Sequence, residues 1–118
     1  MSVSFEGIGA SFVSMETSGT VTPGTPVKMS GNGTVSACAN GERFMGVAVT
    51  VAADGVANVQ VRGYITMPCS GTLPAVGWAR LVSSTGGKLK TDTAASPAGG
   101  EYLIVDKDST EAKIGFVL

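Results

Sequence analysis

The chain contains no histidine among its 118 residues, so the side chain that most often acts as a general base is missing. This absence excludes Ser-His-Asp and Cys-His catalysis and every zinc site that uses histidine. The remaining acid–base candidates are carboxylates, and Asp106, Asp108 and Glu111 gather around one predicted turn. They offer oxygen ligands for Ca²⁺, but Glu111 stands where an EF-hand loop needs glycine. We interpret them as a solvated hairpin turn and expect no metal site.

Serine, lysine and cysteine are the other reactive side chains of the sequence. A Ser-Lys dyad is formally allowed, with Ser83 or Ser84 beside Lys88, but ordinary hairpin composition explains the same residues. Cys38 and Cys69 alone cannot complete a tetrahedral zinc site. A disulfide would need their Cα atoms within about 7 Å, which the sequence leaves open, and we interpret them as two small buried residues. We therefore expect a protein that is not an enzyme and binds no cofactor.

Composition narrows the classes of partner. The eight basic and nine acidic residues give a net charge of −1, which provides no basic face for nucleic acid. No apolar run reaches the roughly 18 residues of a membrane span, and no signal peptide is visible, so we expect a chain made in the cytoplasm without a membrane partner. Only 14% of the residues are charged. A surface so poor in charge favours burial in a larger assembly over a free monomer.

The dominant hydrophobic period is two residues, as in half-buried β-strands. The clearest run extends from Ala57 to Met67, with Gly63 at its centre suggesting a bulge or a bend. One predicted face carries Val59, Val61, Gly63, Ile65 and Met67, and the other carries Asn58, Gln60, Arg62, Tyr64 and Thr66.

Turn sequences separate further runs of this kind, and each pair predicts a β-hairpin. The turns are Gly31-Asn32-Gly33, Ala52-Ala53-Asp54-Gly55, Ser84-Thr85-Gly86-Gly87 and Asp108-Ser109-Thr110-Glu111. No stretch predicts a helix, because glycine and β-branched residues are spread throughout. The sequence thus predicts an all-β fold, a small single-domain barrel or sandwich built from hairpins. We expect residues 21–118 to form this domain and residues 1–20 to form an N-terminal arm or an edge strand.

Four segments, taken in order, resemble the small capsid decoration ("cement") proteins of tailed bacteriophages and prophages. They are Pro23-Gly24-Thr25-Pro26-Val27-Lys28-Met29-Ser30-Gly31-Asn32-Gly33-Thr34-Val35, Phe44-Met45-Gly46-Val47-Ala48, Pro74-Ala75-Val76-Gly77 and Glu101-Tyr102-Leu103-Ile104-Val105-Asp106. The resemblance implies a β-tulip-like domain without enzyme activity, forming a homotrimer on the outer capsid surface of the virion. The resemblance implies the major capsid protein as the partner. Binding of the trimer to that protein would stabilise the head.

Members of this family often present an N-terminal arm to the capsid. In this chain that arm corresponds to Ser2–Phe12, and the resemblance implies capsid contacts at Ser2, Val3, Phe5, Ile8 and Phe12. Two other functions remain open. The chain could be a tail or connector subunit of a phage, or a small carbohydrate-binding or adhesion module in which Trp78 or Tyr64 stacks on a sugar ring.

Overall fold

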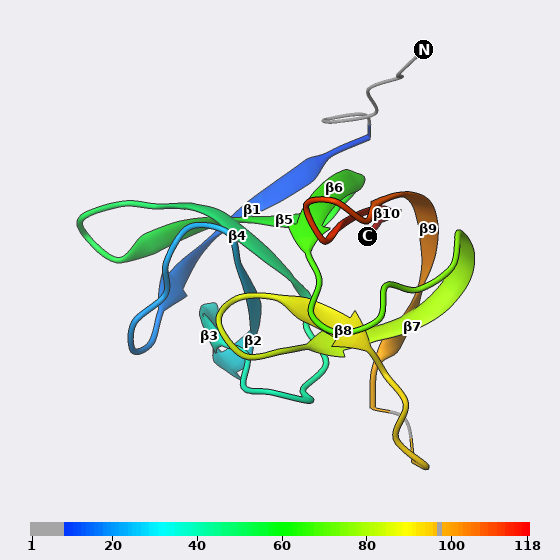
Figure 1. Cartoon of the computed structure of the whole chain (residues 1–118). Helices are drawn as coiled ribbons and strands as arrows, with labels where there is room; N and C mark the ends of the chain where they lie inside the picture. The colour runs from blue at the N-terminus through cyan, green and yellow to red at the C-terminus, as the bar shows by residue number, and fades with distance from the viewer. Residues whose placement is uncertain (1–8, 97) are drawn as a thin grey trace.

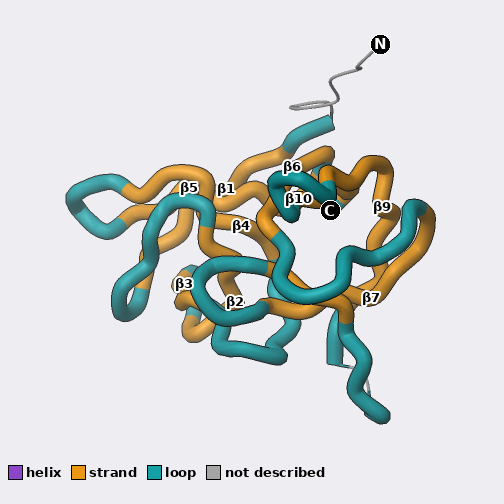
Figure 2. Tube along the Cα trace, in the orientation of Figure 1, coloured by secondary structure: helices purple, strands orange, loops and turns teal. Residues whose placement is uncertain are grey.

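The computed structural model describes residues 9–96 and 98–118, and it is an all-β fold without a helix in those residues (Figure 2). The strands are β1 (Ser11–Thr17), β2 (Thr25–Gly31), β3 (Thr34–Ala37), β4 (Gly46–Val51), β5 (Val56–Arg62), β6 (Tyr64–Pro68), β7 (Gly77–Ser83), β8 (Leu89–Thr91), β9 (Gly100–Asp108) and β10 (Lys113–Val117). All four predicted turns connect paired antiparallel strands, which confirms the predicted hairpins.

The first half of the chain forms a closed barrel with the strand order β1-β3-β2-β4-β5. Strand β1 closes it by pairing with β5 along its length and with β3 in parallel at Glu16 and Thr17. Residues 11–17, which belong to the predicted N-terminal arm or edge strand, therefore form part of the barrel wall. Figure 1 shows the barrel strands on the left of the molecule.

The second half forms a five-stranded sheet with the order β6-β10-β9-β7-β8. Its neighbouring strands are all antiparallel. The loop after β6 covers the edge of β8, because Cys69 bridges to Leu89 and the Ser70 N–H donates to the Leu89 carbonyl at 2.8 Å. Figure 1 shows β6, β7, β9 and β10 on the right, beside the barrel.

Gly63 is the point where the chain leaves the barrel for the second sheet. The prediction of one strand from Ala57 to Met67 is wrong here, because β5 ends at Arg62 and β6 begins at Tyr64 in the other sheet. Gly63 has a φ of +96°, and a Cβ atom on it would lie 2.6 Å from the Cα of Ala10. Glycine is needed for both reasons, since an L side chain rarely adopts this φ and has no space.

Gln60, predicted on the polar face, is instead buried beside this junction. Its side-chain amide donates 3.1 Å hydrogen bonds to the carbonyls of Arg62 and Tyr64, on either side of Gly63. The buried amide thus fixes the backbone where the chain changes sheets.

Strand β4 serves two hydrophobic cores, which explains why its sequence alternates poorly. Ala48 belongs to the barrel core, while Val47 and the preceding Phe44 pack into the core of the second sheet. Phe44 lies within a three-ring cluster, stacked on Tyr102 with ring centroids 5.0 Å apart and edge-on to Phe116 at 6.2 Å. The two halves are therefore joined by side chains as well as by the chain.

Candidate interaction surfaces

Four of the five implied capsid-contact residues, Ser2, Val3, Phe5 and Ile8, lie outside the described residues. The fifth, Phe12, lies near the start of β1, opposite Gln60 of β5, with 47% of its surface exposed. Val13 beside it is 42% exposed. The structure thus places one implied contact residue on an accessible apolar segment of the barrel wall.

A second apolar surface crosses the outer face of the second sheet. The register pairs Trp78 with Leu103, Leu103 with Val117, and Val117 with Tyr64, which places four side chains in one row across β7, β9, β10 and β6. Trp78 is 69% exposed, and Leu103 and Val117 are exposed as well. We call these four residues the outer row.

Alternation along each strand explains why this row faces outward. On β7, Leu81 is fully buried and Ala79 packs against the core, so Trp78 and Arg80 point to the other side. On β10, Ile114 and Phe116 are buried on the core side and Val117 is exposed on the other side.

Tyr64 has a second role in the outer row. A Cβ on Gly115 would collide with the Tyr64 ring, so the ring lies over the glycine of the neighbouring strand. Gly115 is accordingly buried although it faces the outside of the sheet. An aromatic ring laid over a strand glycine covers backbone that would otherwise be open to water.

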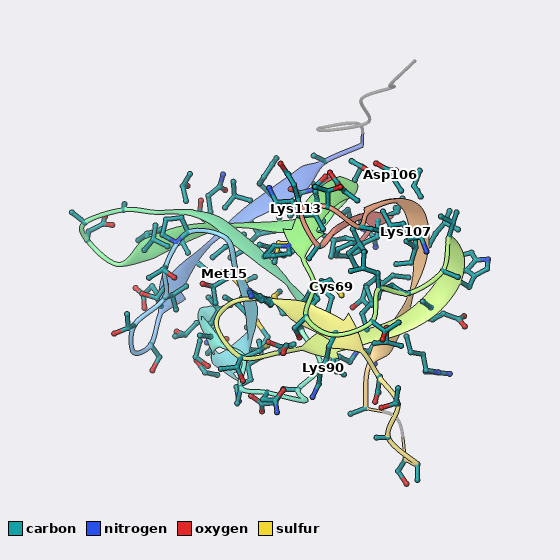
Figure 3. The ribbon with its side chains drawn as sticks, in the orientation of Figure 1. Met15, Cys69, Lys90, Asp106, Lys107 and Lys113 are labelled. Atoms are coloured by element: carbon teal, nitrogen blue, oxygen red, sulfur yellow. The ribbon has the colours of Figure 1, made fainter. Side chains whose placement is uncertain are left out.

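Charged residues flank the outer row on both sides. Arg80 and Glu101 face each other across β7 and β9 on one side. On the other side, Lys113 pairs in register with Asp108, and Asp106 pairs with Gly115. Figure 3 labels Asp106, Lys107 and Lys113 together at the β9–β10 end of the molecule. An apolar centre with a polar rim is typical of protein–protein contact surfaces.

The predicted carboxylate cluster forms a hairpin turn. One oxygen of Asp108 accepts the backbone N–H groups of Thr110 and Glu111 at 2.9 and 3.2 Å, and Glu111 forms an exposed ion pair with Lys113. Within residues 9–96 and 98–118, no group of three His, Cys, Asp or Glu side chains is placed to hold a metal ion.

The serines of the formal Ser-Lys dyad make structural hydrogen bonds. The Ser84 hydroxyl lies 2.7 Å from that of Ser70, and the Ser83 hydroxyl donates to the Ser84 carbonyl at 3.4 Å. A shallow hollow of about 450 Å³ opens near Ser70 and Lys90, lined also by Gly71, Thr72, Leu73, Pro74, Thr91 and Thr93. Its lining residues offer hydroxyl groups and one ammonium group but no carboxylate or thiol.

Cys38 and Cys69 are both free thiols. Burial raises the pKa of Cys38 to about 11, and the Glu42 carboxylate adds to the rise against the smaller opposing effect of Lys28. Burial also raises the pKa of Cys69. Because the thiolate is the reactive form, both side chains are weak nucleophiles at neutral pH. Their position in and beside the core agrees with the interpretation as small packing residues.

Sequence reasoning missed the outer row as a unit. Trp78 and Tyr64 were noticed only as possible sugar-stacking rings, and Leu103 and Val117 were not singled out. The signal was present in part, because the predicted β9–β10 hairpin and its alternation leave Val117 on the outer face. The register between β9 and β7, two strands separated by a long excursion of the chain, could not be read from local patterns.

Comparison with known proteins leaves the family open: no protein-family model matches the chain, and no curated protein matches it. No helix in the described part of the chain is long and apolar enough to cross a membrane.

Proposed function

We propose that this protein is a non-enzymatic structural component of a virion that binds the outer surface of a tailed-phage capsid and stabilises it. Its partner is the major capsid protein, and it binds as a homotrimer on the mature head. The proposal is supported by the four segments that resemble the decoration proteins and by the small all-β fold.

The outer row is the observation that carries the proposal. A charge-poor domain that leaves Trp78, Leu103 and Val117 exposed in one row offers an apolar contact surface. Exposed apolar surfaces that include aromatic residues fit another protein surface better than they fit a small ligand, which needs a concave site. The shallow hollow beside Ser70 does not compete with the outer row as a binding site.

Stabilisation of a shell needs no catalytic group. A protein that binds the mature shell and not its dissociated subunits shifts the equilibrium toward the shell by mass action. Three copies held together turn three weak contacts into one strong attachment through effective concentration. Residues Ser2-Val3-Ser4-Phe5 add a second attachment if they pair as a strand with an exposed edge of the capsid protein.

The test is addition of the purified protein to undecorated heads of its own phage, followed by sedimentation and thermal melting of the heads. We expect binding and a higher melting temperature. Trp78→Ser should weaken binding, whereas Met29→Ser, a matched change at a 49% exposed barrel residue, should not. Heads that neither bind the protein nor gain stability would contradict the proposal. Binding to purified tails instead would favour the tail or connector alternative.

A carbohydrate-binding function is the second candidate, and the exposure of Trp78 is the observation in its favour. The indole is 69% exposed on a sheet face, and the nearby Arg80 and Glu101 offer polar partners for hydroxyl groups. A glycan array separates the two functions. Specific binding that Trp78→Ser abolishes would favour this candidate, and an array without hits would remove it.

A further inference from the structure

Strand β1 pairs with β3 over two residues, and the rest of its edge on that side is open in the described part of the chain. The two strands pair only at Glu16 and Thr17, where β3 begins at Thr34. Within the described residues, Ser11–Met15 have no strand on that side, although β5 pairs with all of them on the other. Unpaired strand edges invite the addition of another strand.

The backbone direction at this edge follows from two hydrogen bonds. The Glu16 N–H donates to the Gly33 carbonyl at 3.1 Å, on the β3 side, and the Thr17 N–H donates to the Gly55 carbonyl at 3.0 Å, on the β5 side. Because this direction alternates along a strand, the N–H and carbonyl groups of Phe12 and Ser14 point to the open side. An added strand would therefore meet two residues with both backbone groups available.

We infer that this edge pairs with the same edge of a second copy of the chain, antiparallel, about a two-fold axis at Val13. In that register Phe12 of one copy exchanges both backbone hydrogen bonds with Ser14 of the other, and the reverse pair repeats it. The two Val13 residues then form the central non-hydrogen-bonded pair, with Cα atoms about 4.5 Å apart. A two-fold contact requires such a self-complementary surface.

The surroundings of the edge fit this occupant. Gly9 and Ala10, through which the chain enters β1 from the eight residues before them, continue along Gly63 on the β5 side. Among the described residues, these two therefore do not cover the open edge. Phe12 and Val13, on opposite faces of β1, are 47% and 42% exposed, so a second strand would shield apolar surface on both faces.

The contact is small, which sets its strength. Five residues of strand extend over roughly 17 Å, and such an interface buries well under the roughly 1,200 Å² typical of stable complexes. The association is therefore weak and dependent on concentration. It is a two-fold contact, distinct from the proposed three-fold association on the capsid, and it would join copies from neighbouring trimers.

The test is disulfide trapping in the full-length protein without any capsid, so its outcome is independent of the proposed function. Val13→Cys should form a linked dimer under mild oxidation, since the paired Cα atoms fall within the range of a disulfide. Val49→Cys is the matched control, because Val49 is 37% exposed on β4 in the middle of the barrel wall. We expect Val13→Cys to cross-link roughly ten-fold faster than Val49→Cys, because pairing raises the effective thiol concentration.

A second variant separates strand pairing from chance collision. Ser14→Pro removes an N–H that points to the open edge and leaves the β5 hydrogen bonds of β1 in place. Combined with Val13→Cys, it should reduce cross-linking to the rate of the Val49→Cys control. Equal rates for Val13→Cys and Val49→Cys in folded proteins, or a rate unaffected by Ser14→Pro, would overturn the inference.

Discussion

The barrel and the second sheet are stabilised by cores of different character. The barrel core is built from valine and alanine, namely Val21, Val27, Val35, Ala48, Ala57 and Val59. The core of the second sheet contains Phe44, Phe116, Leu81, Leu89, Ile104 and Ile114, with Tyr102 packed against it. A narrow barrel has an interior just wide enough for small side chains. A sheet facing the outer wall of a barrel leaves a layer about 10 Å thick that larger residues must fill.

The outer surfaces differ in a parallel way. The barrel exposes apolar side chains where β1 has an open edge, at Phe12 and Val13. The second sheet exposes them on its outer face, in the outer row that crosses four neighbouring strands. An open edge suits strand addition, and an exposed apolar sheet face suits docking of another protein surface. The two halves therefore provide two different modes of contact.

The largest expected effect comes from removing the ring that joins the two halves. Phe44→Ala deletes a 1% exposed side chain that contacts both Tyr102 and Phe116. We expect the free energy of unfolding to fall by about 3–5 kcal/mol, as for other buried phenylalanines. Urea titration followed by far-UV circular dichroism measures it. Val49→Ala, at an exposed site on the same chain segment, should change it by less than about 0.5 kcal/mol.

Substitution at the junction should come next in size. Gly63→Ala places a Cβ against the backbone of Ala10 at a φ of +96°. Strain of this kind costs about 2–3 kcal/mol. Gly31→Ala is the control, because its φ is not positive and its Cβ would lie an ordinary 3.7 Å from Thr34. Equal urea midpoints for the two variants would show that the junction is not strained by a side chain.

The local sequence pattern predicts the hairpins correctly, but it does not predict the structure where the barrel and the second sheet meet. Turn chemistry and period two predicted all four hairpins, because each depends on residues close in sequence. Gly63 was interpreted as a bend within one strand, since Val59, Val61, Ile65 and Met67 keep the same period on both sides of it. Nothing in that alternation tells whether the second part pairs with the same sheet.

The two candidate interaction surfaces, the outer row and the open edge of β1, also depend on strand pairings that local sequence does not predict. The exposure of Trp78 and Val117 follows from alternation, but their alignment with Leu103 depends on the pairing of β7 with β9. The open edge of β1 depends on a parallel contact with β3 that spans two residues. Both features arise from pairings between strands that no short turn connects, and such pairings leave no mark in local sequence.

A substitution in the barrel core tests whether the barrel and the second sheet unfold together. Val59→Ala removes the two methyl groups of a fully buried side chain, and we expect the free energy of unfolding to fall by about 1.5–2 kcal/mol. The single tryptophan, Trp78, lies on the second sheet, so its fluorescence reports that half while circular dichroism reports all strands. Coincident urea curves from the two probes are expected if the cores unfold together. Separate curves would mean that Phe44 and Val47 do not couple the halves.

The smallest expected effect is a loss of stability at acid pH, and it involves two exposed carboxylates. One lies where the barrel meets the second sheet, and the other lies within the second half. The hydrogen bond from Lys28 of β2 lowers the pKa of Glu42, with the Ala39 N–H adding to it, and Glu42 lies in a loop whose backbone bonds to Ser83 of β7. In the second half, the N–H groups of Gly99 and Ala94 lower the pKa of Asp92.

A folded-state pKa below its unfolded value contributes stability above the unfolded pKa, near 4 for these groups, and this stability is lost as the pH falls through the folded pKa. The urea midpoint of unfolding should therefore decline slightly as the pH falls below about 5. Glu42→Gln should remove part of that decline, because glutamine does not titrate and no longer forms the ion pair with Lys28 that acid pH breaks. Because both groups are exposed, solvent screening keeps the effect small. A decline that is the same in Glu42→Gln and in the parent protein would assign it to other carboxylates, and the Lys28–Glu42 pair would then contribute nothing measurable to the junction.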